Sequence, residues 1–523
     1  MPQRLALREG WSQDASIVTT WVTGPMDRIA REAKAAMRNA ESYAVWHEAA
    51  SVLDQREGLD EWMEQDASED YDWRLLRSRL RQLQQLRAEG DVPALVHYLR
   101  QGLHWNLGNI GNPVLYAYAR TGTKNLIDQY LQSVSEALEW LADTSLPELP
   151  HAKKLKFFRD LTRSFGQSAL LLSGGATLGL FHVGVVKAIY LEGLLPRVLS
   201  GSSAGSVVAA AVSTRNEEET LALLDPENSY YRFWRALRPA DMLRFGSVMD
   251  PTQLRRAIAA NVPDLTFEQA YEVSGRSLNI TVSPAGSNQS PRLLNHLTFP
   301  YLCIREAVAA SCAVPLIFPP VMLMTRDARG ARVPFMPALK WNDGSLKSDL
   351  PMKRLRRLHN INHFVVSQTN PHVIPFMARA EGGPRAGRLA GLRKLATGLL
   401  LQQSRSIADI ARSGLPDGAL RKPLDVAASM LDQNYRGNVT IMPQNSLWRF
   451  MRVAANPRID DVRRFILEGE RATWPRMAQL RSQLMIGQTL ERCLATLEAP
   501  ESQRRPLTRK PRALRLVRQQ AAE

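Results

Sequence analysis

One repeated pattern limits the possible folds of this chain more than any other. Between about residues 168 and 370, short apolar runs end in glycine-rich turns and lead into helical segments. Residues 169–172 and 198–199 are two such runs, and residues 278–282 and 364–367 are predicted to be further buried strands. Strands that alternate with helices form a mainly parallel sheet covered on both faces. The pattern therefore predicts a three-layer α/β/α domain.

The flanking segments have a helical pattern instead. In residues 73–89 leucines recur near the 3.6-residue period, at Leu75, Leu76, Leu80, Leu83 and Leu86. After Pro371 a helical pattern returns. We predict a helical N-terminal domain over 1–145, the α/β domain over 165–375, a helical C-terminal extension over 376–500 and a basic, disordered tail over 501–523. The N-terminal domain lacks a catalytic cluster, so a scaffold or lid role is expected.

The charge balance favours an anionic partner. The chain carries 67 Lys and Arg against 51 Asp and Glu, a formal net charge of +16. Much of the excess lies in residues 504–518, and no helix-turn-helix, zinc finger or aromatic RNA-binding motif accompanies it. Nucleic acid is therefore not expected as a partner. The tail is interpreted either as a solvated segment or as an attachment to anionic lipid.

Other segments bear on membranes and on redox state. Residues 1–14 lack an apolar core, which predicts no secretory signal. Residues 169–186 carry no charge, but their glycines and His182 favour a strand, turn and helix over a membrane span. Residues 392–411 suit either a packed helix or one lying on a lipid surface. The three cysteines, Cys303, Cys312 and Cys493, have neither disulfide nor metal-ligand spacing, and we expect them to be buried and reduced.

A candidate nucleophile stands in residues 201–205 (GSSAG), which match G-x-S-x-G. This pattern needs a strand, a strained turn and a helix, so that the serine hydroxyl is presented at the top of the sheet. Residues 197–199 supply the end of a strand, and residues 206–213 (SVVAAAVS) supply the helix. Ser203 is therefore the predicted nucleophile.

A glycine-rich loop precedes it, at residues 173–179 (SGGATLG), again between an apolar strand and a helix. Glycines let backbone N–H groups approach a reacting centre, as in an oxyanion hole. A phosphate-binding loop is the alternative, but the G-K-[ST] ending and the G-x-G-x-x-G spacing are missing. The oxyanion interpretation is preferred.

A serine needs a base to become nucleophilic, and Asp343 in residues 341–345 (WNDGS) is the candidate. Taken alone, Asp-Gly more often marks an ordinary surface turn. A Ser-Asp-His triad is a second possibility, because His359, His363 and His372 follow in the chain order of α/β-hydrolases. Packing or loop roles for these histidines are favoured.

The set of motifs resembles the patatin-like acyl hydrolases, a family with a Ser–Asp dyad. The family's G-G-x-x-x-G is met by Gly174, Gly175 and Gly179, and its A-S-x-A-x-P segment by residues 310–315 (ASCAVP). Its elbow is met by Gly201, Ser203 and Gly205, and its Asp-Gly by Asp343 and Gly344. Leu178 departs from the family, in which many members carry a basic residue at that place, and Ser345 is a milder change.

The resemblance implies a function and a mechanism. Ser203 would attack an ester, Asp343 would act as base and then acid, and the backbone of Gly174, Gly175 and Ala176 would form the oxyanion hole. Neither a metal nor an organic cofactor is implied. An acyltransferase with the same dyad, or a silent lipid-binding scaffold, are the alternatives.

A closer subgroup accounts for most of residues 15–495. Residues 103–130, 367–372 and 469–475 resemble lipid-droplet triacylglycerol lipases, in which a helical domain of unknown function precedes the patatin domain. The subgroup implies cleavage of triacylglycerols or phospholipids by a cytoplasmic protein attached to a membrane or droplet surface.

Overall fold

The computed structural model describes residues 25–286, 289–371, 373–374, 435–443 and 455–500. The basic tail, the segment 392–411 and His372 lie outside the described residues.

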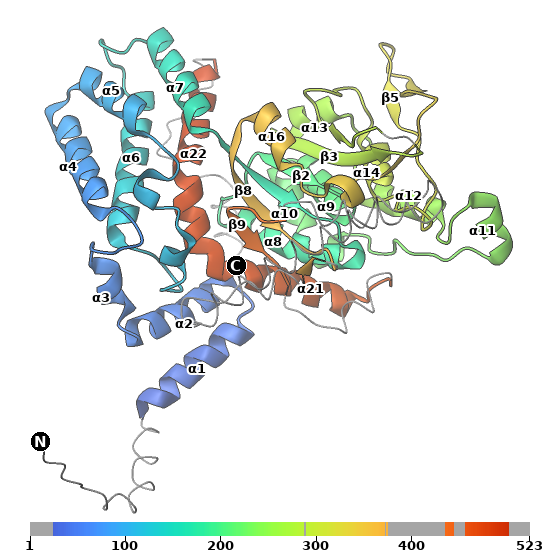
Figure 1. Ribbon diagram of the computed structural model, residues 1–523, viewed down its shortest axis with the longest axis horizontal. Coiled ribbons are helices and arrows are strands. Elements are labelled where there is room, and N and C mark those ends of the chain that lie inside the picture. Colours follow the sequence, from blue (N-terminus) through green and yellow to red (C-terminus); the bar gives the residue numbers. More distant parts are fainter. Residues whose placement is uncertain (1–24, 287–288, 372, 375–434, 444–454, 501–523) are drawn as a thin grey trace, which may run out of the picture.

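A single sheet organises the centre of the chain (Figure 1). Seven strands are ordered β4–β3–β2–β1–β8–β9, and β7 pairs with β3. Their bounds are β1 Gln167–Leu172, β2 Val198–Gly201, β3 Ser277–Pro284, β4 Arg292–Leu294, β7 Trp341–Asp343, β8 Ile361–Ser367 and β9 Val439–Ile441. Strands β3, β2, β1, β8 and β9 are parallel to their neighbours, whereas β4 and β7 run antiparallel to β3. The four strands expected from the sequence are all present, which confirms a mainly parallel sheet.

Helices cover both faces of the sheet, because successive side chains of a strand point to opposite faces. Leu170 and Leu172 of β1 belong to a large core with helices α8, α9, α12, α13 and α14. Ala169 and Leu171 face the other way, into a smaller core with α16. The bounds are α8 Leu180–Leu191, α9 Ala204–Ser213, α10 Glu217–Leu223, α11 Pro239–Phe245, α12 Pro251–Asn261, α13 Phe267–Ser274, α14 Ile304–Ser311, α15 Ser345–Ser348 and α16 Met352–His359. The expected α/β/α layering is confirmed.

The N-terminal region is helical, as expected, and has its own core. Its helices are α1 Pro25–Asn39, α2 Tyr43–Arg56, α3 Leu59–Glu64, α4 Trp73–Glu89, α5 Val92–Gly102, α6 Asn125–Asp143 and α7 His151–Phe165. The leucine pattern of α4 buries Leu76, Leu80 and Leu83, while Leu75 stays 39% exposed. One stripe of α4 thus faces the core and the rest faces solvent.

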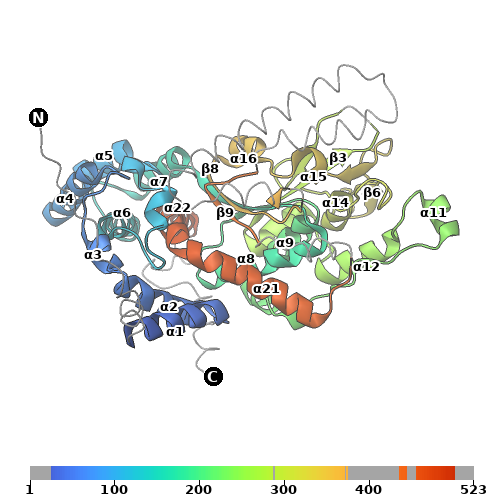
Figure 2. The same ribbon diagram turned by 60° about the horizontal axis from the view of Figure 1, so that its bottom comes forward.

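The described part of the C-terminal region is mainly helical, as expected, and it also adds one strand to the sheet. Residues 439–441 are a strand, β9, which extends the sheet beside β8. Helix α21 (Ile459–Thr473) packs against α8, and α22 (Met477–Glu498) packs against α6 and α7 of the N-terminal region (Figures 1 and 2). The helical pattern after Pro371 could not reveal this, because it carries no information about which core each helix joins.

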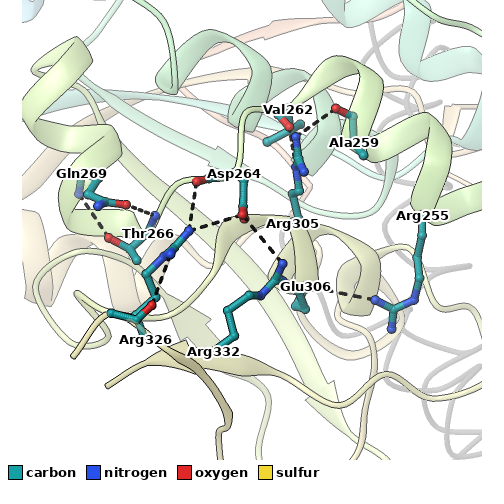
Figure 3. A network of polar contacts seen from close by, with 11 residues as sticks. Arg255, Ala259, Val262, Asp264, Thr266, Gln269, Arg305, Glu306, Arg326 and Arg332 are labelled. Atoms are coloured by element: carbon teal, nitrogen blue, oxygen red, sulfur yellow. Dashed lines mark hydrogen bonds and ion pairs between the residues drawn. The ribbon is translucent and has the colours of Figure 1, made fainter. Parts of the chain in front are cut away.

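A charged network ties the hairpin β5 (Met324–Arg326) and β6 (Arg332–Pro334) to the main domain (Figure 3). Asp264 lies 3.3 Å from Arg326 and 3.7 Å from Arg332. Arg332 also pairs with the buried Glu306 of α14, and Arg305 Nε donates to the Val262 carbonyl at 2.8 Å. These contacts fix the start of α14, whose last residue, Ser311, reaches the site described below.

Two further expectations concern the uncharged stretch and the cysteines. The uncharged stretch 169–186 forms most of β1, a glycine-rich turn and the first half of α8, and no described helix is long and apolar enough to cross a membrane. Cys303, Cys312 and Cys493 are free thiols and all three are buried.

Candidate functional site

Three loops meet at the carboxyl edge of the sheet. Leu172 of β1 stands beside Gly201 of β2 and Ser367 of β8, and each strand ends at or next to that residue. The glycine-rich loop, the G-x-S-x-G turn and residues 368–370 follow these strands directly. In open parallel sheets this edge is where ligands bind.

Ser203 occupies a strained turn between β2 and α9. Its φ is 50° and its ψ −123°, outside the regions that non-glycine residues favour. The turn is tight on both sides: a Cβ at Gly201 would stand 2.4 Å from the Gly205 carbonyl oxygen, and one at Gly205 would stand 2.2 Å from that of Leu172. This is the geometry of a nucleophile elbow.

The elbow is held by the A-S-x-A-x-P segment. The Ser203 N–H donates to Ser311 Oγ at 2.9 Å, and Ser206 Oγ donates to the Ser203 carbonyl at 2.6 Å. Two residues after Ser311, the Ala313 carbonyl accepts a hydrogen bond from the Asp343 N–H at 2.9 Å. One short segment therefore positions both the serine and the aspartate.

Sheet topology brings Asp343 to the elbow. β2 lies along β3 up to the pair Gly201–Ile280, and β4 occupies the opposite edge of β3. β7 pairs with β3 through Asp343 and Val282, so it takes the place beyond the end of β2. The strand that carries Asp343 runs antiparallel to β3, so its last residue, Asp343, lies close to where the strand before Ser203 ends.

Burial dominates the electrostatics of Asp343. Its side chain is 1% exposed, and burial raises its pKa to about 6, while the Ser345 and Ser203 groups close to it lower the pKa. Oδ1 accepts the Ser345 N–H at 2.7 Å. Oδ2 is buried and has no hydrogen-bond partner within the described ranges. A looser contact between serine and carboxylate is common in a site without substrate.

The glycine-rich loop lies against Ser203. A Cβ at Gly174 would stand 3.4 Å from the Ser203 Cβ, and one at Gly179 would stand 2.5 Å from the Ala204 Cβ. Gly175 and Ala176 begin the short 3-10 helix η3 (Ala176–Gly179), where backbone N–H groups have no partner within the helix. Among the described residues no hydrogen bond is formed by these two N–H groups.

Gly174 differs from the other two expected oxyanion donors. Its N–H donates at 2.9 Å to Oδ1 of Asp349, a carboxyl that is 1% exposed. The other oxygen of Asp349 accepts a hydrogen bond from the Asn370 amide. Burial raises the pKa of Asp349 to about 8, with the charge of Asp343 as a further cause in the same direction.

A second polar cluster anchors the start of the loop. His182 contacts Ser367 Oγ at 2.7 Å, the Ser173 carbonyl at 2.9 Å and Thr369 Oγ1 at 3.0 Å. Burial lowers the pKa of His182 to about 4, so its ring is neutral at physiological pH. Its three contacts are to residues next to the loop, which makes it a positioning group.

Two of the three histidines considered for a triad, His359 and His363, lie away from the elbow. His363 stands opposite Ser168 at the start of β1 and contacts Gln483 at 2.7 Å. His359 contacts Asn279 at 3.0 Å, in the first half of β3. Both are therefore toward the amino edge of the sheet, away from the elbow.

Several residues of the site were not predicted from the sequence. Ser311 stood in a motif whose role was not assigned, and Asp349 and Asn370 had no pattern of their own. An acidic residue six positions after Asp343, in an otherwise weakly charged stretch, was the available signal for Asp349. Gly344 lies in the turn after Asp343, where a Cβ would stand 2.5 Å from the Thr281 carbonyl carbon.

An apolar cavity of about 150 Å³ adjoins Ser203. Helices α8 and α9, the segment 229–234 and the segment 312–318 supply its walls. Apolar lining residues include Leu180, Val183, Val207, Val208, Val212, Phe233, Trp234 and Phe318. Few polar atoms interrupt this lining, which suits a hydrocarbon chain. Groups of acidic, cysteine and histidine side chains able to hold a metal are absent from the residues that the structure describes.

Comparison with known proteins adds to this geometry. A domain of unknown function, DUF3336, matches residues 25–163, and the family described as patatin-like phospholipase matches residues 170–356. Triacylglycerol lipase SDP1L of Arabidopsis thaliana is 34% identical, over 88% of this chain and 58% of its own length. Triacylglycerol lipase ptl3 of Schizosaccharomyces pombe is 34% identical, over 87% of this chain and 95% of its own.

A third relative, triacylglycerol lipase 4 of Saccharomyces cerevisiae, is 35% identical over 84% of this chain and 50% of its own length. This chain thus spans about half the length of two of these relatives and nearly the whole of the other. The solved structure of VipD from Legionella pneumophila is only remotely similar, with a TM-score of 0.25 and 15% identity over 58% of this chain and 67% of that one. On the evidence of its two domains and its relatives, the chain belongs to the patatin-like phospholipase family, in a branch that carries a DUF3336 domain ahead of the patatin domain.

Proposed function

We propose that this protein is a lipid ester hydrolase, of the triacylglycerol lipase or phospholipase A type, with Ser203 as nucleophile and Asp343 as its base. The observation that carries the proposal is the buried Asp343 carboxyl, whose Oδ2 lacks a partner among the described groups, beside a strained serine that adjoins an apolar cavity. The relatives named as triacylglycerol lipases support the same substrate class.

The first step is acylation. Asp343 accepts the proton of the Ser203 hydroxyl as the serine oxygen attacks the ester carbonyl. The protonated carboxyl then gives this proton to the departing alkoxide, the C–O bond breaks, and an acyl-serine remains. A base works best when its pKa lies near the operating pH, and burial has moved the Asp343 pKa toward it.

The proposed oxyanion hole has fewer N–H donors than the motif implies. We assign it to the N–H groups of Gly175 and Ala176, which make no hydrogen bond within the described ranges. Gly174 is not included among the oxyanion donors, because its N–H already donates to Asp349. Each donor of such a hole stabilises the transition state by about 3–4 kcal/mol.

Deacylation repeats the cycle with water. Asp343 takes a proton from the water, the hydroxide oxygen attacks the acyl-serine, and the serine oxygen recovers the proton as the fatty acid leaves. The acyl chain lies in the apolar cavity throughout, so its burial contributes equally to both steps.

The purified full-length chain tests the proposal. A fluorophosphonate probe should label the wild type but not Ser203→Ala, and long-chain triacylglycerols or phospholipids should be cleaved. Ser203→Ala and Asp343→Asn should each lower turnover by about 10³-fold or more while the circular dichroism spectrum stays unchanged. Ser202→Ala is the matched control. The Ser202 hydroxyl is next to Ser203 in the chain, but it accepts a hydrogen bond from Thr281 and has no part in the proposed dyad.

Two results would contradict the assignment. Labelling or turnover that persists in folded Ser203→Ala would rule out the nucleophile. A wild type that neither reacts with the probe nor cleaves any ester would favour the alternative of a silent lipid-binding scaffold.

A further inference from the structure

Helix α11 projects from the end of the molecule remote from the helical N-terminal region (Figures 1 and 2). It caps a hairpin that is closed by the Leu237 N–H, which donates to the Val248 carbonyl at 3.0 Å. Two large apolar side chains at its tip face solvent, with Leu243 90% exposed and Phe245 40% exposed. Neither contributes to a hydrophobic core formed by the described residues.

Two more exposed apolar residues adjoin this hairpin. Val248 is 46% exposed, and its N–H donates to the carbonyl of Leu316 at 3.2 Å. Leu316 is 82% exposed and has a φ of 72°, a conformation that is costly for a residue with a β-carbon. The fold thus holds a leucine in a strained turn without burying it. We call Leu243, Phe245, Val248 and Leu316 the apolar tip.

The apolar tip is joined along the chain to two segments that line the cavity beside Ser203. Tyr230, Tyr231, Phe233 and Trp234 line the cavity, and the same segment then runs into α11. On the other side, Val314 and Phe318 line the cavity and flank Leu316 in sequence. The rings of Trp234 and Phe318 lie 5.8 Å apart and join the two segments. Two of the four segments that supply the cavity walls therefore lead along the chain to solvent-exposed apolar side chains.

The charges around the apolar tip are mostly positive. Arg232, Arg238 and Arg244 are exposed and form no ion pair with any residue that the structure describes. Arg235 is neutralised by Asp250, which leaves Asp241 as the remaining acidic residue of the segment. Basic side chains beside protruding apolar ones match a surface of anionic phospholipid, whose headgroups attract the cations.

We propose that the apolar tip inserts into a phospholipid surface while Arg238 and Arg244 contact its anionic headgroups. Docking there would bring the two segments that line the acyl cavity to the lipid from which substrate is drawn. A protruding apolar tip is better suited to insertion into a lipid layer than to binding in a groove of another protein. The use of this surface rests on the proposed lipid-ester hydrolysis, but the binding itself is measured independently of catalysis.

The first experiment measures sedimentation of the full chain with vesicles of phosphatidylcholine, with and without phosphatidylserine. It is done on the Ser203→Ala protein, so that no lipid is consumed. The double variant Leu243→Glu/Phe245→Glu should bind about tenfold more weakly or worse. Leu297→Glu is the matched control, since Leu297 is 53% exposed on the same domain but outside the apolar tip. Arg238→Gln/Arg244→Gln should weaken binding to the phosphatidylserine vesicles alone.

The second experiment reports insertion directly, whatever other segment binds lipid. The chain has three cysteines and all are buried, so a cysteine introduced on the surface can be labelled selectively. An environment-sensitive fluorophore on Leu243→Cys should shift to the blue when vesicles are added. The same label on Leu297→Cys should not shift.

Activity on a short, water-soluble ester separates docking from chemistry. With Ser203 intact, Leu243→Glu/Phe245→Glu should keep its kcat/KM for that ester and lose hydrolysis of vesicle lipid. Unchanged vesicle binding, a label at position 243 that stays in water, or a parallel loss of soluble-ester turnover would each overturn the proposal. If no variant hydrolyses any ester but insertion at position 243 is observed, docking stands and the proposed function falls.

Discussion

At the scale of single residues, the site holds two buried carboxyl groups with different roles. Asp343 has the lower pKa, about 6, and is largely ionised at neutral pH. Asp349 has a pKa of about 8, raised by burial and then by the charge of Asp343, and is mostly protonated there. One of the two carboxyls is thus available as a base, and the other serves as a neutral anchor for the loop at Gly174.

Turnover should therefore depend on the ionisation of Asp343. Only the carboxylate accepts the Ser203 proton, so kcat/KM for a soluble ester should rise with pH through a value of about 6. The measurement is the pH profile of kcat/KM at constant ionic strength. A profile that is flat across that value would mean that another group activates the serine.

Asp343→Asn should make the protein more stable at neutral pH while removing its activity. The folded-state pKa of Asp343 is above its unfolded value, so its contribution to stability is full at low pH and is lost as pH rises through about 6. A neutral asparagine avoids this loss, which amounts to about 3 kcal/mol in free energy of unfolding. Urea denaturation at neutral and acidic pH measures the difference, which should vanish in acid. Equal stability of the two proteins at both pH values would contradict the shift.

Asp349 should act by holding the glycine-rich loop in position and not through a negative charge. Asp349→Asn keeps an oxygen for the Gly174 N–H and matches the mostly neutral native group, so kcat should fall by less than about tenfold. Asp349→Ala leaves that N–H without an acceptor and should lower kcat by about 10²-fold with little change in KM. Steady-state kinetics on a soluble ester measure both. Equal losses in the two variants would indicate a general packing role instead.

The sequence pointed to the proposed reacting groups more readily than to the residues that hold them in place. Ser203 and Asp343 stand in short motifs with a local structural meaning, and the structure brings them together. Ser311, Asp349 and Asn370 act through contacts with residues far away in the sequence, such as the 175 positions between Gly174 and Asp349. No local sequence pattern distinguishes a carboxyl that will accept a hydrogen bond from a distant N–H. The roles of these residues are therefore visible only in the folded structure.

At the scale of elements, the strands of four or more residues in the sheet were predictable, and the three-residue strands were not. β1, β3 and β8 are buried along most of their length and show it in their composition. β4, β7 and β9 have three residues each, too few for a periodic pattern. Yet β7 is the strand that carries Asp343, so the element that completes the candidate site was among the least visible.

The face of α9 should set the preferred acyl length. Val207 and Val208 line the cavity from this helix, both within about one and a half turns of Ser203 at its N-terminus. Val208→Phe fills part of that space, so kcat/KM for long-chain esters should fall by about tenfold or more while a butyrate ester is cleaved as before. A series of p-nitrophenyl esters measures the ratio. An equal loss for all chain lengths would mean that the substitution distorts the elbow.

At the scale of the whole molecule, the two cores are joined by one continuous helix. The first turns of α22 place Met477, Leu480 and Leu484 in the core of the sheet domain. Its later turns place Ile486, Leu490, Cys493 and Leu497 in the core of the N-terminal region. A helix shared in this way cannot leave one core without disturbing the other, so the two regions should unfold together.

The crossing of α8 and α21 should therefore control the stability of the whole chain. A Cβ at Gly184 of α8 would stand 1.8 Å from the backbone oxygen of Ile466 in α21, and backbone cannot rotate out of the way as a side chain can. Gly184→Ala should lower the free energy of unfolding by about 1–3 kcal/mol or more. Because α21 leads directly into α22, the loss should shift a single calorimetric transition that includes the N-terminal region.

Gly487→Ala in α22 is the matched control. A Cβ there would stand 3.6 Å from a ring carbon of Phe165, an ordinary contact, and alanine favours a helix by about 1 kcal/mol over glycine. Its melting temperature should stay equal or rise. If Gly184→Ala instead splits the transition in two and leaves the N-terminal region at its wild-type melting temperature, the shared helix does not couple the two cores. Loss of soluble-ester turnover should then follow the lower transition alone, because Gly184 lies on the helix that directly follows the glycine-rich loop.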